Sequence, residues 1–346
     1  MTPAHPHNAP AILVVGPSWV GDMVMAHPLF QLLKIKYPTV PIDVLAPPWS
    51  QPLVERMPEI RQGIPMPLQH GQLGLGIRWH LGHGLQGRYH HAIVLPNAFK
   101  SALIPFFARI PRRTGFIGEA RLGVLNDLRR CDPQKYPQTA QRFAALSLDG
   151  TESLPTPLPP PHLTHLPQRV CATFRGLGLR LDYPHNIALC PGAEFGPAKR
   201  WPIHHFQTLA TLCAEAGYRV LALGSQKEYP LGEAIRSAAG PHGVNLAGAT
   251  TLAEVVDLLS FVQGVVTNDS GLMHVAAALN RPVIAIFGSS DPHHTPPMST
   301  QAHVLTRNLP CAPCFKRQCP LQPQAPCLEE ITPQMVMDQL RSMLSP

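Results

Sequence analysis

The chain has 346 residues, of which 45% are apolar and 14% charged, so it can form two domains with sizeable cores and is not disordered throughout. No apolar run reaches the roughly 18 residues that a membrane-spanning helix needs, and the N-terminus lacks the regions of a secretion signal. We therefore expect a cytoplasmic protein, whose contact with a membrane would be peripheral.

The net charge of +7 lies entirely in the first half of the chain. Residues 1–150 hold 15 Lys and Arg against 8 Asp and Glu, a difference of +7, whereas residues 151–346 hold 13 of each. Seven of the cations fall between Lys100 and Arg130. Such a basic half favours a nucleic acid, an acidic membrane surface or a phosphorylated substrate as partner. A solvated basic face without a partner is the alternative.

Strand and helix patterns alternate along the chain. The predicted strands are 11–16, 42–46, 92–95, 187–190, 219–224, 262–267 and 283–287. The predicted helices are 24–36, 99–108, 169–177, 204–216, 228–239, 252–260, 272–279 and 332–344. The stretch 71–87 contains six glycines and stays unassigned. Residues 154–167 have the proline-rich composition of a stiff linker. We therefore predict two doubly wound α/β domains, 1–165 and 166–346, that face a central cleft.

The turn after the first predicted strand contains two glycines, Gly16 and Gly21, with the spacing of a phosphate-binding P-loop. Asp22 and Met23 stand where that motif requires Lys and Ser or Thr, which excludes a triphosphate cradle, and the turn is not a dinucleotide fingerprint either. Asp22 lies at a helix start and is a candidate general base. The alternative is simple charge complementarity with the helix dipole.

The corresponding turn of the second domain, residues 191–202, carries Lys199 and Arg200 just before a helix. Glycines for backbone access and two cations suit a diphosphate. Glu194 in the same turn has no charge-based explanation. A second carboxylate, Glu228, follows the strand 219–224, in a position that can hold a ribose diol.

The segment 267–274 reads Thr-Asn-Asp-Ser-Gly-Leu-Met-His between an apolar strand and an Ala-rich helix. Ser270 is a natural N-cap, and Gly271 gives a ligand access to the backbone. A helix N-terminus attracts anions, and His274 shares a helix face with Ser270. The alternative is a capped helix with a buried histidine.

Four of the eight cysteines form the pattern Cys311-x2-Cys314-x4-Cys319-x7-Cys327. Four thiols at this density could hold zinc. We favour reduced thiols in a loop, because the spacing is irregular and the segment is rich in proline.

Together these motifs resemble glycosyltransferase family 9, the bacterial ADP-heptose:lipopolysaccharide heptosyltransferases. Within the family the chain looks closest to the members that add the second heptose. The matching segments occur in the expected order over nearly the whole chain: 16–25, 95–101, 113–116, 191–202, 268–274, 287–292 and 311–327.

The resemblance implies a GT-B fold with two Rossmann-like domains, the first holding the acceptor and the second the donor. It implies inverting transfer of L-glycero-D-manno-heptose from ADP-heptose to a heptosylated Kdo–lipid A core, by an enzyme peripheral at the inner membrane of a Gram-negative cell. Transfer of the first heptose and use of another nucleotide sugar remain alternatives. A nucleic-acid-binding protein with a zinc knuckle is disfavoured by the few aromatic residues and the neutral second half.

The resemblance also implies roles for single residues. Asp22 matches the proposed catalytic base, and Lys100 and Arg113 are candidates for binding acceptor phosphate. The donor-binding residues are Lys199 and His274 at the phosphates with Ser270 and Gly271, Asp269 at the heptose and Glu228 at the ribose. No cofactor or metal is predicted, because no carboxylate pair typical of metal binding stands out.

Overall fold

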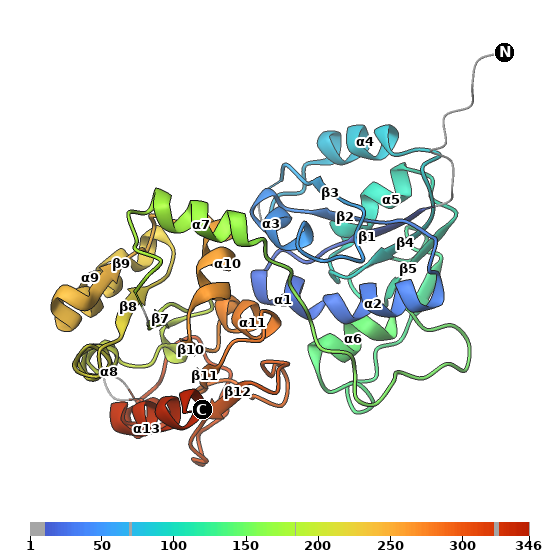
Figure 1. Ribbon diagram of the computed structural model, residues 1–346. Coiled ribbons are helices and arrows are strands. Elements are labelled where there is room, and N and C mark those ends of the chain that lie inside the picture. The colour runs from blue at the N-terminus through green and yellow to red at the C-terminus, as the bar shows by residue number, and fades with distance from the viewer. Residues whose placement is uncertain (1–10, 69–70, 184, 322–324, 346) are drawn as a thin grey trace. The chain divides into compact units, whose positions relative to one another are not determined.

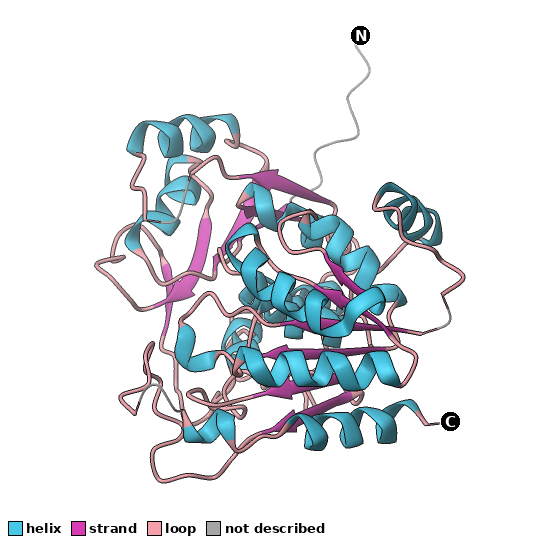
Figure 2. Ribbon diagram, turned by 90° about the vertical axis from the view of Figure 1, so that its left-hand side faces the viewer, coloured by secondary structure: helices cyan, strands magenta, loops and turns pink. Residues whose placement is uncertain are grey.

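The computed structural model describes residues 11–68, 71–183, 185–321 and 325–345 (Figure 1). The chain divides into two compact units, Met1–Pro161 and His162–Pro346, and the division falls within the proline-rich stretch. Each unit is built on a six-stranded parallel sheet with helices beside it, as Figure 2 shows. The predicted α/β fold is therefore confirmed.

The sheet of the first unit has the order β3-β2-β1-β4-β5-β6. Its strands are β1 (Ala11–Val15), β2 (Ile42–Ala46), β3 (Gln62–Pro65), β4 (Tyr89–Val94), β5 (Arg112–Phe116) and β6 (Asp127–Arg129). All residues of β1 and β2 are buried, as the continuous apolar run of the first strand predicts for a parallel sheet covered on both faces. The strand order reverses between β1 and β4.

The helices of the first unit are α1 (Val20–Met25), α2 (His27–Lys36), α3 (Gln51–Val54), α4 (Leu75–Gly84), α5 (Leu103–Phe107) and α6 (Thr139–Ala145), with short 3-10 turns η1 (Pro48–Ser50) and η2 (Phe99–Ala102). The helix predicted over 24–36 is in fact two helices that meet at Ala26, since Pro28 occupies the first turn of α2. Helix α4 lies in the stretch left unassigned. Gly82 lets it approach α5, because a Cβ there would lie 2.5 Å from Cβ of Phe107.

The second unit repeats the topology with the order β12-β11-β10-β7-β8-β9. Its strands are β7 (Asn186–Cys190), β8 (Arg219–Ala222), β9 (Gly243–Asn245), β10 (Gly264–Asn268), β11 (Val283–Ile286) and β12 (Ala302–Leu305). Here the order reverses between β7 and β10. Both units thus have the strand order of a Rossmann fold.

The helices of the second unit are α7 (Pro167–Gly176), α8 (Ile203–Glu215), α9 (Tyr229–Ala239), α10 (Leu252–Phe261), α11 (Gly271–Ala278), α12 (Pro326–Glu329) and α13 (Pro333–Leu344), with 3-10 turns η3 (Pro197–Lys199), η4 (Gln226–Glu228) and η5 (Gly240–His242). One core cluster joins β7, β10 and β11 to α8 and α13, and the fully buried Trp201 belongs to it. Among the described residues, no helix combines the length and the apolar character that crossing a bilayer requires.

Candidate active site

Ligands of open α/β sheets bind at the carboxyl ends of the strands where the strand order reverses. In the first unit Asp22 follows β1, and Lys100 lies in η2 after β4. In the second unit Lys199 lies in η3 after β7, and Asp269 follows β10. Within each unit, the topology therefore brings two predicted site residues to the reversal point of the sheet.

Lys199 and Asp269 are in direct contact. The Lys199 Nζ donates a hydrogen bond of 2.5 Å to Asp269 Oδ2, and the Ser290 hydroxyl donates to the same oxygen at 2.5 Å. The two charged side chains are only 18% and 6% exposed, so their attraction is less screened than that of a surface pair. The Lys199 Nζ also lies 5.0 Å from the ring centroid of Phe195. An ammonium group is thus held in place at this edge of the sheet, beside the start of α11.

The buried side chain of Asn268 shapes this edge. Its Nδ2 donates to Pro191 O at 2.7 Å, and its Oδ1 accepts from Trp201 N at 2.9 Å. The two partners lie at the two ends of the turn that carries Lys199, so one amide fixes the span of that turn. Sequence reasoning gave Asn268 no role of its own and missed Ser290. The available signal for Asn268 was an amide side chain directly at the end of a continuously apolar strand.

Ser270 occupies the N-cap position of α11, but its side chain makes no capping hydrogen bond, so that part of the prediction is wrong. Its backbone is extended, with φ −147° and ψ 171°, and its Oγ lies 3.2 Å from the Thr267 Oγ1 instead. The first N–H groups of a helix have no partner within the helix. Those of α11, beginning at Gly271, are consequently not satisfied by the serine and can serve an anion.

His274 lies one turn further along α11 and is 5% exposed. Burial, reinforced by the charge of Lys199 and opposed by that of Asp269, lowers the pKa of His274 to about 4. The imidazole is therefore neutral near pH 7 and contributes hydrogen-bonding capacity rather than positive charge. Positive charge in this part of the site comes from Lys199 and from Arg317, whose guanidinium lies 5.3 Å from the same Phe195 ring.

Glu228 is buried at the end of η4, where its Oε2 accepts a hydrogen bond of 2.6 Å from Ser225 N. A Cβ on Gly192 would lie 2.2 Å from Glu228 Oε1, and a Cβ on Gly224 would lie 2.9 Å from Oε2. The carboxylate thus fits between the backbones that follow β7 and β8. Glu194, which had no explanation, forms a 3.1 Å ion pair with Lys227. Both side chains are more than half exposed, so this pair contributes little stability.

In the first unit, Asp22 is half-buried in the first turn of α1, where the helix dipole stabilises a carboxylate. The loop before it is held by the 3-10 turn η1 that follows β2, since the Trp49 indole donates to Ser18 O at 2.9 Å. Lys100 is also half-buried. Glu119 holds the start of its 3-10 turn, because Phe99 N donates a hydrogen bond of 2.9 Å to Glu119 Oε2.

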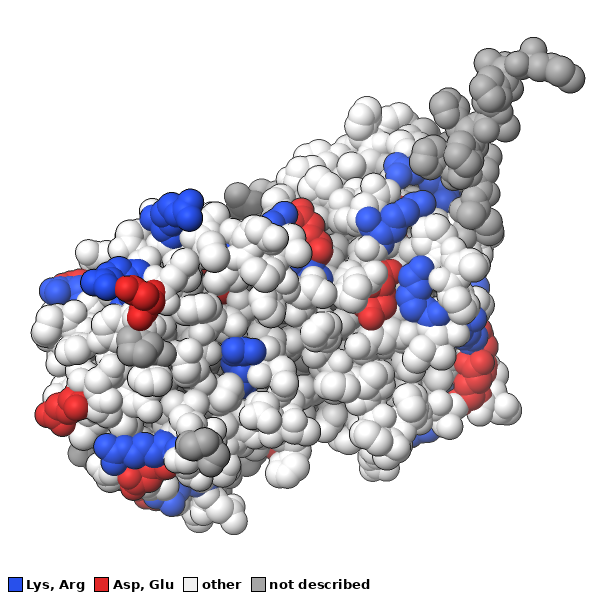
Figure 3. All heavy atoms as spheres, in the orientation of Figure 1, with Lys and Arg blue, Asp and Glu red and all other residues white. Residues whose placement is uncertain are grey.

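Several cations of the basic segment 100–130 stabilise the unit itself. The Arg113 guanidinium donates to Val124 O at 2.7 Å and to Ile110 O at 2.5 Å. Arg112 and Arg129 pair with Asp127 at 2.9 and 2.7 Å. The pKa of the Asp127 carboxyl is far below its usual range, chiefly because the Arg129 guanidinium donates to it. Buried Arg121 donates to Pro96 O at 2.8 Å. The basic surface is therefore smaller than the sequence count implies, and Figure 3 shows acidic and basic side chains side by side.

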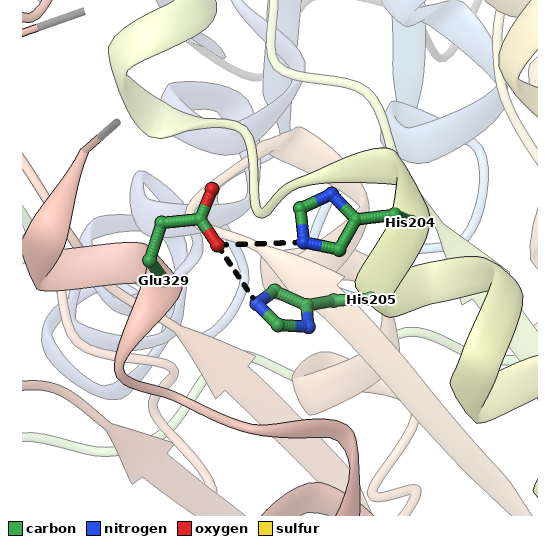
Figure 4. A group of neighbouring side chains, drawn as sticks. All are labelled: His204, His205 and Glu329. Atoms are coloured by element: carbon green, nitrogen blue, oxygen red, sulfur yellow. Dashed lines mark hydrogen bonds and ion pairs between the residues drawn. The ribbon is translucent and has the colours of Figure 1, made fainter. Parts of the chain in front are cut away.

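One side-chain group in the described part of the chain has the composition of a metal site. His204 and His205 of α8 both direct Nε2 to Glu329 Oε2 of α12, at 3.4 and 3.1 Å (Figure 4). Each imidazole can donate to the carboxylate, so the group can be satisfied without an ion. The four clustered cysteines, all described, do not form such a group. Burial is the main reason that the pKa of Cys327 is raised to about 11, and the neighbouring Cys311 raises it further. The neutral thiol of Cys327 is therefore favoured.

The fold and the site together define a class of protein. The chain has two Rossmann-like units. The reversal point of the second sheet carries a lysine and an uncapped helix N-terminus, and that of the first carries a carboxylate. This combination is typical of a GT-B transferase that uses a nucleotide sugar. Residues 78–325 match the family described as Glycosyltransferase family 9 (heptosyltransferase), and the chain belongs to this family.

Relatives agree with this assignment. Lipopolysaccharide heptosyltransferase 2 of Salmonella typhimurium is 46% identical over 96% of this chain and 98% of its own length. The solved structure of Escherichia coli ADP-heptose lps heptosyltransferase II matches with a TM-score of 0.86 and 43% identity, over 96% of this chain and 98% of that one. Lipopolysaccharide heptosyltransferase 1 of Pseudomonas aeruginosa is 33% identical over only 42% of this chain and 44% of its own.

Proposed function

We propose that this glycosyltransferase moves L-glycero-D-manno-heptose from ADP-heptose to the heptosylated Kdo–lipid A core, adding the second heptose of lipopolysaccharide. One observation carries the proposal. The chain matches a heptosyltransferase 2 over nearly the full length of both proteins at 46% identity, whereas it matches a heptosyltransferase 1 over less than half of either. The first-heptose reaction is thereby the weaker candidate.

In the proposed reaction, an acceptor hydroxyl attacks the anomeric carbon of the donor heptose. The carboxylate of Asp22 accepts the hydroxyl proton as the new C–O bond forms. The bond between the anomeric carbon and the diphosphate oxygen breaks on the opposite side, so the configuration is inverted, and its electron pair stays with ADP. The transition state has oxocarbenium character.

The donor residues divide by chemistry. The diphosphate, on which negative charge develops, suits Lys199 and the N–H groups at the start of α11. These N–H groups begin at Gly271, and Ser270 precedes them. Asp269, next to Lys199, suits a heptose hydroxyl, and Glu228 suits the ribose. Neutral His274 supplies a hydrogen bond near the phosphates. These fixed groups supply the charge stabilisation, and we propose that no metal or other cofactor is required.

On the acceptor side, Lys100 and Arg113 are proposed to contact phosphate or carboxylate groups of the core. Arg113 uses two donors for backbone carbonyls, and a guanidinium carries five, so it keeps capacity for an anion. Because the acceptor is a lipid, we propose that the protein meets the inner membrane peripherally from the cytoplasm. The basic balance of residues 1–150 supports this, and no nucleic acid partner is proposed.

The test is ADP release from ADP-heptose by wild type and by Asp22→Asn, with a heptosylated or an unheptosylated Kdo–lipid A acceptor in detergent micelles. We expect release with the heptosylated acceptor and a loss of about 10²- to 10⁴-fold in the variant. Release only with the unheptosylated core would identify the first-heptose reaction. If no ADP is released with either acceptor, but UDP or GDP is released from a UDP- or GDP-sugar, the donor assignment is refuted.

A further inference from the structure

The first unit carries an exposed apolar surface, on α4 and α5, that the proposed reaction does not use. We call it the α4–α5 face. Its large apolar side chains, with their exposed fractions, are Leu75 (52%) and Trp79 (50%), which lie four residues apart on one side of α4, and Phe106 (41%) of α5. Single exposed apolar residues are ordinary, whereas a group of them marks an interaction surface.

Helix α4 leaves two large apolar side chains of one side in solvent. Its buried residues are Arg78 and Gly82, and Leu81 packs on the core, whereas Leu75 and Trp79 are exposed. Arg78 is held inward by a 2.6 Å hydrogen bond from its Nε to Leu73 O. Gly82 packs on Phe107, leaving no room for a side chain. Since a helix on a monomer ordinarily turns its apolar side to the core, this arrangement indicates an apolar partner outside the unit.

A hollow of about 480 Å³ joins the two helices, lined by Trp79, His83, Phe106, Phe107, Arg109 and Arg113. Trp79 and Phe106 therefore belong to one continuous surface. Trp79 lies against His83 with ring centroids 4.2 Å apart, and the Arg113 guanidinium lies 5.7 Å from the Phe106 ring. Aromatic rings next to guanidinium groups are typical of the boundary between acyl chains and headgroups.

The charge of this region has one sign. The 59 residues from Ile60 to Gly118 contain no Asp or Glu, but seven Lys and Arg. Of these, Arg61, Arg88 and Arg109 are exposed, and Arg61 pairs with Asp43. The acidic residues Asp127 and Asp149 lie elsewhere in the unit and are paired with arginine or lysine. The α4–α5 face is thus apolar with exposed cations, which makes it complementary to an anionic lipid surface.

We propose that the α4–α5 face docks the protein on an anionic bilayer. The exposed apolar side chains of α4 enter the headgroup region, with Trp79 and Phe106 at the boundary, while Arg88 and Arg109 contact lipid phosphates. This inference rests on the proposed function, because a lipid-borne acceptor is what requires the enzyme to meet the membrane. It adds the surface that makes the contact and the lipid charge that this surface selects.

The test is co-sedimentation of the full chain with vesicles of phosphatidylethanolamine and phosphatidylglycerol, compared with vesicles of phosphatidylcholine. We expect binding to the anionic vesicles that weakens with salt. Arg109→Glu should lower the partition coefficient by at least about fivefold, as expected when one basic residue near the surface is lost. The double variant Leu75→Ser, Trp79→Ser should lower it by about tenfold or more, because two apolar side chains no longer enter the interface.

Matched controls change equally exposed residues away from the face. Ile35→Ser alters an apolar residue of α2 that is 73% exposed, and Arg175→Glu alters an exposed cation of α7 in the other unit. Both should bind vesicles as wild type does. Circular dichroism melting shows whether each variant is folded. If folded face variants bind as tightly as wild type, or if the controls lose as much binding as the face variants, the inference is overturned.

ADP release with the acceptor in detergent micelles separates this inference from the proposed function. Release without vesicle binding would refute the docking face alone, whereas vesicle binding without release would refute the reaction and leave the docking result standing. If wild type ignores vesicles but forms dimers that Trp79→Ser dissociates, the face serves self-association and the lipid assignment is wrong.

Discussion

Lys199 and Asp269, 70 positions apart in the sequence, share a 2.5 Å hydrogen bond at the reversal point of the second sheet. Because Ser290 donates to the same carboxylate oxygen, Asp269 is oriented from two sides. The pair holds a lysine in place without removing it from solvent, since its side chain keeps 18% exposure. A diphosphate that approaches Lys199 would compete with Asp269 for the ammonium group, so the two residues should have separable effects on ADP and on heptose.

The first prediction concerns that separation. Lys199→Met should lower kcat by about 10²- to 10³-fold, because the cation that stabilises the departing diphosphate is lost. Asp269→Asn should instead tighten the binding of ADP, since Lys199 no longer has an anionic partner, while heptose transfer becomes slower. Isothermal titration with ADP and steady-state ADP release measure the two effects.

Lys227→Met is the matched control, because Lys227 is a lysine that pairs with a carboxylate near the same site but is 79% exposed. It should leave both measurements within about twofold of wild type, as expected for a surface pair. Weaker ADP binding by Asp269→Asn would contradict the idea that the aspartate competes with phosphate.

The second prediction concerns Gly192. Replacing it by alanine places a Cβ 2.2 Å from Glu228 Oε1, so the carboxylate must move. Gly192→Ala should cost about 1–3 kcal/mol of stability, as overpacking does, and should raise KM for ADP-heptose more than it lowers kcat. Gly176→Ala is the control, because a Cβ there meets nothing within 4 Å. A Gly192→Ala enzyme with unchanged stability and KM would show that Glu228 has no fixed position relative to the turn.

The sequence predicted the fold well, for a physical reason, and the residues predicted for the site follow from the same pattern. Strands such as β1 and β10 are buried on both faces and are therefore continuously apolar, and the polar segments that follow them lie where the strand order reverses. The short edge strands were harder to detect. β3 is exposed or half-buried throughout and β6 has three residues, so neither has an apolar run.

Helix α4 and the network around Asp127 illustrate what sequence patterns could not give. The glycines of α4 left this segment unassigned, because the reason for Gly82 is a tertiary contact with α5. Arg112, Arg121 and Arg129 counted as surface charge, although Arg112 pairs with Asp127 of the next strand and the other two donate to the backbone carbonyls of Pro96 and Leu148. The hydroxyl of Ser270 turns to Thr267 rather than capping α11, a choice between two local hydrogen bonds that composition does not decide.

The third prediction concerns metals. Because Lys199 and the start of α11 supply the stabilisation proposed for the diphosphate, ADP release should be unchanged after treatment with EDTA and gel filtration. The variant Glu329→Gln removes the carboxylate that His204 and His205 share, and it should also retain activity. Loss of activity on chelation, restored by a divalent cation, would contradict the metal-free reaction. If Glu329→Gln abolished that restoration, the ion would be located at this group.

The fourth prediction concerns acid. Burial lowers the pKa of His274 to about 4, and burial together with the charge of Arg112 lowers that of His91 to about 4. The unfolded chain therefore binds more protons than the folded one between pH 6.5 and pH 4, where 6.5 is the ordinary histidine value. Stability contributed by the neutral imidazoles is present above pH 6.5 and is lost as the pH falls towards 4.

Between pH 7.5 and pH 5, each of these histidines should reduce the free energy of unfolding by up to about 2 kcal/mol. Urea denaturation at several pH values measures the slope, and His91→Gln should make it shallower, because glutamine does not titrate while it can still hydrogen-bond to Thr114. A wild-type slope that His91→Gln does not alter would mean that the imidazole of His91 is protonated within the folded unit at pH 5.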